Sequence, residues 1–89
     1  MRPENKRMQQ YLEEHGITGV TPKYLPAGSL KRSWRLHKRG AMWNPVDADR
    51  LNALGFRSIR GGALGNHDGN GGIWQVFVYH PSTDAFLGS

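Results

Sequence analysis

Residues 30–38, LKRSWRLHK, alternate between apolar and polar side chains, and this alternation restricts the fold more than any other feature of the chain. Successive residues of a strand face opposite ways, so Leu30, Trp34 and Leu36 would share one side. The opposite side would carry Lys31, Ser33, Arg35, His37 and Arg39. The pattern predicts a strand in a sheet, with one buried face and one basic outer face.

Two segments have the apolar spacing and the end signals of helices. In residues 3–14 apolar side chains recur every three or four residues, and Gly16 follows as a stop signal. In residues 45–54, Pro45 suits the first helical position, and Gly55 suits the left-handed residue that follows a last turn. We therefore predict helices over residues 3–14 and 45–54.

The remaining apolar runs predict three more strands. Residues 21–25 precede the turn-forming PAGS and pair with residues 30–38 as a hairpin, while residues 56–60 form a short strand after the second helix. Residues 73–79, IWQVFVY, are apolar on both sides, which indicates a central strand covered on both faces or a sheet face covered by a partner. The order α-β-β-α-β-β predicts an α+β fold with two helices on one four-stranded antiparallel sheet.

A chain of 89 residues is long enough for one modest hydrophobic core. We expect a single domain over residues 1–80 and a C-terminal tail over residues 81–89. The absence of cysteine excludes disulfides and thiolate metal sites. The N-terminal segment lacks the apolar core of a signal peptide, and no run approaches the ~20 apolar residues of a membrane span. We therefore expect a cytoplasmic protein with no membrane partner.

Positive charge is the strongest feature of the composition. Twelve Lys and Arg against seven Asp and Glu give a net charge of +5, and no acidic residue occurs in residues 15–46. A field of one sign attracts polyanions, although extra positive charge also serves solubility. Because the charges cluster, we predict an anionic partner. The predicted binding residues are Lys31, Arg32, Arg35, His37, Lys38 and Arg39.

A basic strand near aromatic side chains suits nucleic acid, because Lys and Arg contact phosphates while aromatic rings stack on bases. Trp34, however, shares its side with Leu30 and Leu36, so we expect it in the core. We expect Trp43 to pack beside the second helix. The basic face equally suits an acidic protein groove or the RNA-binding channel of a larger complex.

Residues 61–72 contain six of the twelve glycines and include the sequence GNHDGNGG. A phosphate loop would lead into a helix and use a Lys or Ser/Thr, whereas this segment leads into a strand. A metal site would draw on three or four ligands rather than on the adjacent pair His67 and Asp68. We predict a loop that shapes a binding surface, with no metal and no cofactor. Its candidate binding residues are Asn66, His67, Asp68 and Asn70.

Three stretches together carry a resemblance: GSLKRSWRL, then W-N-P with L-x-x-L-G-F, then GNGGIWQVFV. This arrangement, over residues 17–79, resembles short accessory proteins of phages and other mobile elements. The resemblance implies a protein made early in infection that modulates or blocks host machinery, in its most concrete form an anti-CRISPR or a related anti-defence protein. It carries over no active-site residue. A DNA mimic is disfavoured, because such mimics present an acidic surface.

The sequence therefore predicts a non-enzymatic binding protein that contacts nucleic acid or a host complex that processes nucleic acid. Two alternatives remain open. One is a small metal-dependent nuclease centred on His67, Asp68 and His80. The other is a structural subunit that associates with itself through exposed strand edges.

Overall fold

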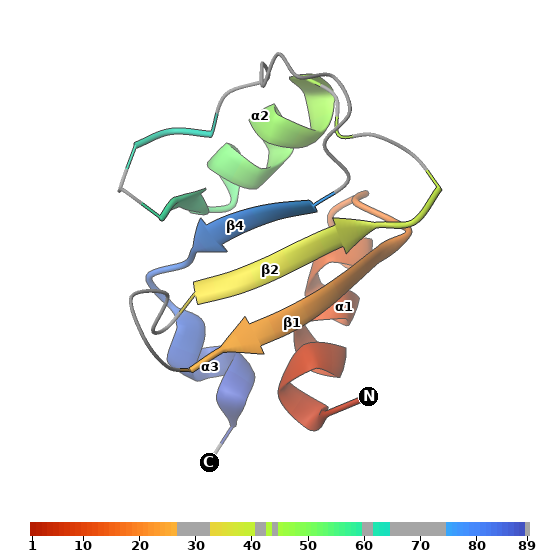
Figure 1. Ribbon diagram of the computed structural model, residues 1–89, viewed down its shortest axis with the longest axis vertical. Coiled ribbons are helices and arrows are strands. Elements are labelled where there is room, and N and C mark those ends of the chain that lie inside the picture. Colours follow the sequence, from red (N-terminus) through yellow and green to blue (C-terminus); the bar gives the residue numbers. More distant parts are fainter. Residues whose placement is uncertain (27–32, 41–42, 44, 60–61, 65–74, 89) are drawn as a thin grey trace.

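The fold is α+β, with three helices and one four-stranded antiparallel sheet in the part of the chain that the structure describes (Figure 1). The structure is a computed structural model, and it describes residues 1–26, 33–40, 43, 45–59, 62–64 and 75–88. The elements in chain order are α1 Pro3–Glu14, β1 Val20–Leu25, β2 Ser33–Lys38, α2 Pro45–Ala53, β3 Arg57–Ser58, β4 Gln75–Tyr79 and α3 Thr83–Leu87. The predicted fold class is confirmed, and the predicted order agrees apart from the additional helix α3.

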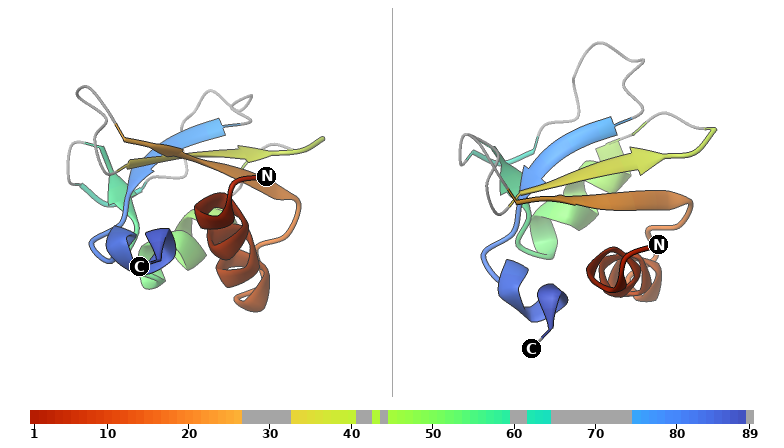
Figure 2. Two further views of the ribbon diagram at one scale, coloured as in Figure 1. Left: turned by 90° about the horizontal axis from the view of Figure 1, so that it is seen from below. Right: turned by 60° about the horizontal axis from the view of Figure 1, so that its bottom comes forward.

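The strands follow the order β1-β2-β4-β3, and every neighbouring pair is antiparallel. The predicted hairpin of β1 and β2 is present, with Lys23 opposite Arg35 in its register. All three helices lie on one face of the sheet, and no helix of the described residues lies on the other (Figure 2). We call the face away from the helices the outer face.

The hydrophobic core fills the space between the sheet and the helices. Trp34 and Leu36 of β2 have no exposed surface, and neither has Val78 of β4. Met8 and Leu12 of α1 are equally buried and close the core from the helix side. The apolar side of the alternation in residues 33–38 therefore faces the helices, and the prediction that Trp34 belongs to the core is confirmed.

The two long helices end in the same way, and each end turns the chain toward the sheet. Gly16 follows α1 with a φ of 83°, and Gly55 follows α2 with a φ of 99°. Glycine adopts this left-handed conformation without the steric cost that a Cβ brings. After Gly16, the Ile17 N–H donates to the Leu12 carbonyl at 2.9 Å, and the Phe56 N–H makes the equivalent bond to Leu51 at 3.0 Å. Both glycines act as the predicted helix terminators.

Helix α3 forms where a C-terminal tail was predicted, so that prediction is wrong for Thr83–Leu87. Phe86 is only 8% exposed, and its ring lies edge-on to Trp34, with 5.9 Å between the centroids. The Arg7 side chain of α1 donates to the Phe86 carbonyl at 3.1 Å. A five-residue helix is unstable alone, and tertiary packing of this kind stabilises it.

The strands differ in extent from their predictions. β3 covers Arg57–Ser58, and the Ser58 N–H donates to the Gly62 carbonyl at 2.8 Å. Of the predicted strand 56–60, residue 60 lies outside the described residues. Residues 30–32 and 73–74, which were predicted to begin the second and fourth strands, lie outside the described residues.

Candidate nucleic-acid interface

Three rows of side chains cross the outer face of the sheet. Residues directly opposite each other in an antiparallel ladder point to the same face, so the register fixes the members of each row. The middle row joins Lys23 of β1, Arg35 of β2 and Phe77 of β4. The flanking rows are Thr21, His37 and Gln75 on one side, and Leu25, Ser33, Tyr79 and Arg57 on the other. Basic and aromatic side chains are therefore neighbours on this face.

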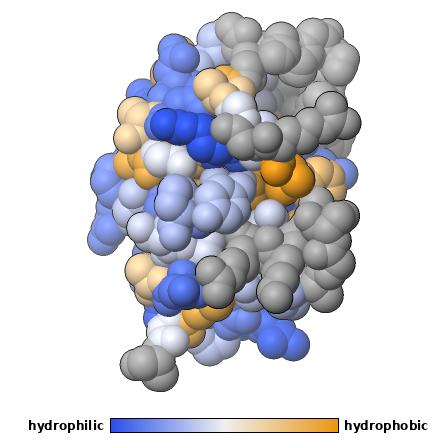
Figure 3. All heavy atoms as spheres, turned by 90° about the vertical axis from the view of Figure 1, so that its left-hand side faces the viewer, coloured by the Kyte–Doolittle hydropathy of each residue, from blue (hydrophilic) through white to orange (hydrophobic). Residues whose placement is uncertain are grey.

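Two aromatic side chains of β4 are exposed on the outer face. Phe77 has 41% of its surface exposed and Tyr79 has 37%. Among the large hydrophobic residues that the structure describes, only Met1 and Val46 are also this exposed, and neither lies in the sheet. On the side of the molecule that Figure 3 shows, hydrophilic residues predominate among the described ones. Of the two interpretations of residues 73–79, burial on both faces is wrong for β4, and a face available to a partner agrees with the exposure.

Negative charge is confined to the helical side of the described molecule. Six of the seven acidic residues lie in the three helices, and the seventh, Asp68, lies outside the described residues. The two ion pairs found among the described residues join Arg2 to Glu4 and Lys38 to Asp47. The described outer face contains no acidic residue, so its cations have no opposite charge beside them there. Such a face produces the positive potential that attracts a polyanion.

Arg35 occupies the centre of the middle row and has unused hydrogen-bonding capacity. Its Nε atom is buried and has no hydrogen-bond partner among the described residues. A buried donor without a partner costs about 1–3 kcal/mol, and such groups are uncommon in folded proteins. A guanidinium has five N–H donors in a planar fork that matches phosphate oxygens. Arg35 is therefore suited to an anionic ligand on this face.

The outer face includes only some of the residues predicted from the sequence. Arg35 and His37 lie there together, and both are half-buried. Arg39 follows β2 in a turn and is exposed, and its backbone N–H donates to the Gly19 carbonyl at 2.9 Å. Arg57 of β3 shares the outer face, but its guanidinium donates to carbonyls near the end of α2. The predicted residues outside the described part of the chain are Lys31, Arg32, Asn66, His67, Asp68 and Asn70.

Lys38 lies on the opposite face from Arg35 and His37. Its Nζ is 2.5 Å from Asp47 Oδ2, and 5.6 Å from the centroid of the Trp43 ring. The Lys38 side chain is 17% exposed and that of Asp47 is 7% exposed. This pair joins the end of β2 to the first turn of α2, where a carboxylate also stabilises the positive end of the helix. Lys38 thus holds a helix against the sheet, and we do not include it in the binding surface.

Sequence reasoning missed several members of the outer face, among them Lys23, Gln75, Phe77 and Tyr79. Lys23 lies in the acid-free segment, but only the pairing of β1 with β2 places it beside Arg35. The aromatic residues belong to a run that is apolar on both sides, so periodicity alone does not tell which side is exposed.

His80, which the nuclease alternative requires, is part of the core. It is 6% exposed, and its ring packs edge-on to Phe56 with centroids 4.6 Å apart. The Ser82 N–H donates to Nδ1 at 3.0 Å, which places the ring proton on Nε2, and Nε2 donates to the Leu54 carbonyl at 3.0 Å. Burial lowers the pKa of His80, and the bond to Leu54 acts in the opposite direction. Both ring nitrogens are occupied, so His80 is not free to bind a metal or to transfer a proton.

Nothing in the described residues assembles a metal site, since no three His, Asp or Glu side chains come together there. Among the same residues no helix has the length and apolar character that crossing a membrane requires. Comparison with known protein families, with curated proteins and with solved structures finds no match for this chain.

Proposed function

We propose that this protein binds single-stranded nucleic acid on the outer face of its sheet, as a binding protein rather than an enzyme. The observation that carries the proposal is the middle row, in which Lys23 and Arg35 lie beside the exposed ring of Phe77. Tyr79 adds a second ring two residues further along β4. Positively charged grooves with aromatic rings are the common means of binding single strands.

The geometry favours a single strand over a duplex. Phe77 and Tyr79 are separated along β4 by roughly 7 Å, so each ring has room for its own base. An aromatic ring stacks on the flat face of a base. In a duplex this face is covered by the neighbouring base pairs, whereas in a single strand it is accessible. Arg35 and Lys23 continue the row toward β1 and would contact the phosphates that connect the stacked bases.

The same surface suits nucleic acid that a larger complex holds exposed. In the setting that the resemblance implies, the protein would bind guide or target strands of a host defence complex and so block it. The placement of the acidic residues on the helices supports this form of the proposal. The basic outer face would be attracted to the nucleic acid of such a complex, whereas the positively charged protein channel would repel it.

The test is fluorescence anisotropy with labelled single-stranded DNA, single-stranded RNA and duplex DNA, at low and physiological salt. We expect both single strands to bind more tightly than the duplex. Phe77→Ala and Tyr79→Ala should each weaken binding by about 1–3 kcal/mol, or roughly 5- to 150-fold. Val46→Ala is the matched control, since Val46 is 52% exposed on α2 and lies outside the sheet.

The proposal fails if no single strand binds at low salt, or if both aromatic variants bind as tightly as the wild type. Incubation of the labelled strands with Mg²⁺ or Mn²⁺ tests the nuclease alternative. We expect the strands to remain intact, and cleavage that purifies with the protein would overturn the non-enzymatic assignment.

A further inference from the structure

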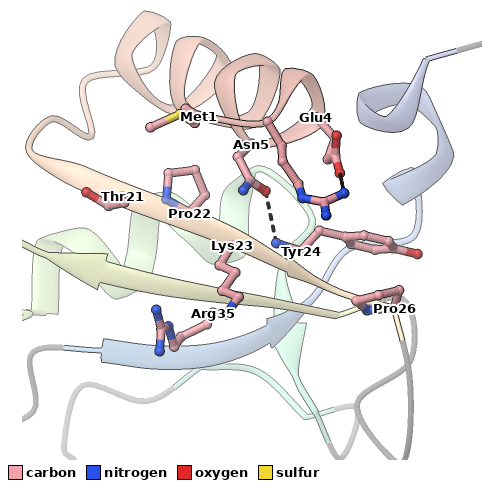
Figure 4. Close-up of a pocket in the computed structure, with 10 residues that line it drawn as sticks. Met1, Glu4, Asn5, Thr21, Pro22, Lys23, Tyr24, Pro26 and Arg35 are labelled. Atoms are coloured by element: carbon pink, nitrogen blue, oxygen red, sulfur yellow. Dashed lines mark hydrogen bonds and ion pairs between the residues drawn. The ribbon is translucent and has the colours of Figure 1, made fainter.

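An open groove of about 500 Å³ runs along the edge of the sheet between β1 and the start of α1 (Figure 4). Arg2, Glu4 and Asn5 line it from the helix side. Lys23 and Arg35 line it from the sheet side, and both side chains point away from α1. These two cations also belong to the middle row of the outer face. The groove is therefore continuous with the proposed binding surface.

The edge of β1 in this groove is poorly suited to an added strand. The Tyr24 N–H, which faces the free edge, donates to Asn5 Oδ1 at 3.0 Å. The Val20 carbonyl accepts from Gln9 Nε2 at 3.3 Å. Between them Pro22 has no N–H to offer, and proline is typical of edge strands for this reason. An extended peptide that paired with β1 would therefore lack three of the ladder groups along this edge.

What the groove offers a ligand is side-chain charge. It contains three cations, Arg2, Lys23 and Arg35, and one carboxylate, Glu4. Glu4 lies 3.9 Å from Arg2, whose side chain is 81% exposed, so this is a loose surface pair. The balance of charge favours an anion.

We infer that the groove carries the sugar-phosphate backbone of the bound strand around the edge of β1, from the outer face toward the start of α1. This inference rests on the proposed function and extends it. Bases that stack on β4 fix one part of the strand, and the groove cations contact phosphates further along. The binding site is then longer than the sheet is wide, so affinity depends on the length of the strand.

The test uses labelled oligothymidylates of increasing length, from three to nine nucleotides, with two variants that alter the groove alone. Arg2→Ser removes a groove cation from the N-cap of α1, where serine is a favoured residue, so the helix is retained. Glu4→Gln removes the carboxylate with little change of shape. Lys6→Ser is the matched control, since Lys6 is exposed on α1 and does not line the groove.

For the wild type, affinity should rise with length up to the longest strands. Arg2→Ser should leave the trinucleotide unaffected and weaken the nonanucleotide about fivefold at 0.1 M salt, with a salt slope smaller by about 0.7. Glu4→Gln should strengthen the nonanucleotide and leave the trinucleotide unchanged. If the wild type binds all lengths and both groove variants match it, the groove inference fails and the proposed function stands. If no length binds, the proposed function fails and the inference fails with it.

Discussion

Arg35 of β2 and Phe77 of β4 are cross-strand partners on the face of the sheet that points away from the helices. Neighbouring strands lie about 4.8 Å apart, so the two side chains leave the sheet side by side. In the proposed complex, a base stacked on Phe77 would have its phosphate close to Arg35. This juxtaposition of a cation without an ion-pair partner in the described chain and an exposed ring distinguishes the outer face from the rest of the described surface.

Arg35→Met should stabilise the free protein and weaken its binding to single strands. The substitution removes a buried donor that has no partner, so the free energy of unfolding should rise by about 1 kcal/mol. It also removes a phosphate contact, which should lower the salt slope by about 0.7. Urea denaturation and anisotropy measure the two effects. Arg50→Met on α2 is the control, and a loss of stability in Arg35→Met would contradict the role assigned to this side chain.

Removal of either member of the Lys38–Asp47 pair should destabilise the fold and leave strand binding unchanged. Both side chains are mostly buried, and an uncompensated buried charge costs about 3–5 kcal/mol when fully enclosed. We expect about 2–3 kcal/mol for Lys38→Met or Asp47→Leu in urea denaturation, because Lys38 retains some exposure. The double variant should recover much of the loss, since it leaves no charge unpaired. If Lys38→Met binds single strands more weakly at a temperature where the variant is folded, Lys38 belongs to the binding surface after all.

Stability should fall as the pH drops below about 6.5, because the pKa of His80 is lower in the folded chain than its ordinary value of 6.5. As the pH falls, His80 is protonated in the unfolded chain before it is protonated in the folded chain. The stability that neutral His80 contributes is therefore complete above pH 6.5, and it is lost as the pH falls toward the pKa of His80 in the folded chain. The slope is at most about 1.4 kcal/mol per pH unit. Denaturation between pH 5.5 and 7.5 measures it, and these limits bracket the titration of an ordinary histidine at about pH 6.5.

His80→Phe provides the comparison for this pH dependence. The variant should have a flatter profile in the same window. It should also be less stable at neutral pH by about 1–3 kcal/mol, because the Leu54 carbonyl and the Ser82 N–H lose their partner. His15→Phe, the same substitution at an exposed site beside the end of α1, is the matched control. A profile in His80→Phe that matches the wild type would show that another group titrates.

Phe86→Ala should destabilise the chain by about 3–5 kcal/mol, the usual cost of emptying a buried aromatic site. The ring packs against Trp34 and Tyr11, so its loss opens a cavity that the core cannot fill. Thermal unfolding followed by circular dichroism measures the change. Asp84→Ala, exposed on the same short helix, should cost little. If the two variants are equally stable, residues 83–87 do not pack against the core and the segment is a tail, as the sequence predicted.

Local patterns in the sequence predicted most of the fold. The alternation around Trp34 and Leu36 placed the buried side of β2 correctly, and the glycines at 16 and 55 marked both helix ends. Helix α3 was missed because its five residues have too few turns to show a period, and its stability comes from contacts with α1 and β2. Long-range packing of this kind leaves no local signal.

The candidate site was predicted in part, and its limits have a physical cause. Strand parity placed Arg35 and His37 on the outer face, but the list of basic residues included Lys38, whose parity points the other way. The pairing of β4 with β2 brings Phe77 beside Arg35, although these residues are 42 positions apart in the sequence (77 − 35 = 42). Only the sheet topology shows that the basic strand has an aromatic neighbour.

The helices hold six acidic residues and the described strands none, so the charge of the described part of the molecule is uneven across its two layers. A polyanion would therefore rotate the protein before contact, so that the outer face arrives first. Orientation of this kind shortens the search for a productive encounter and accelerates association, and the effect falls steeply as ionic strength rises. A protein that must find its target before a competing host factor does gains from this speed independently of how tightly it finally binds.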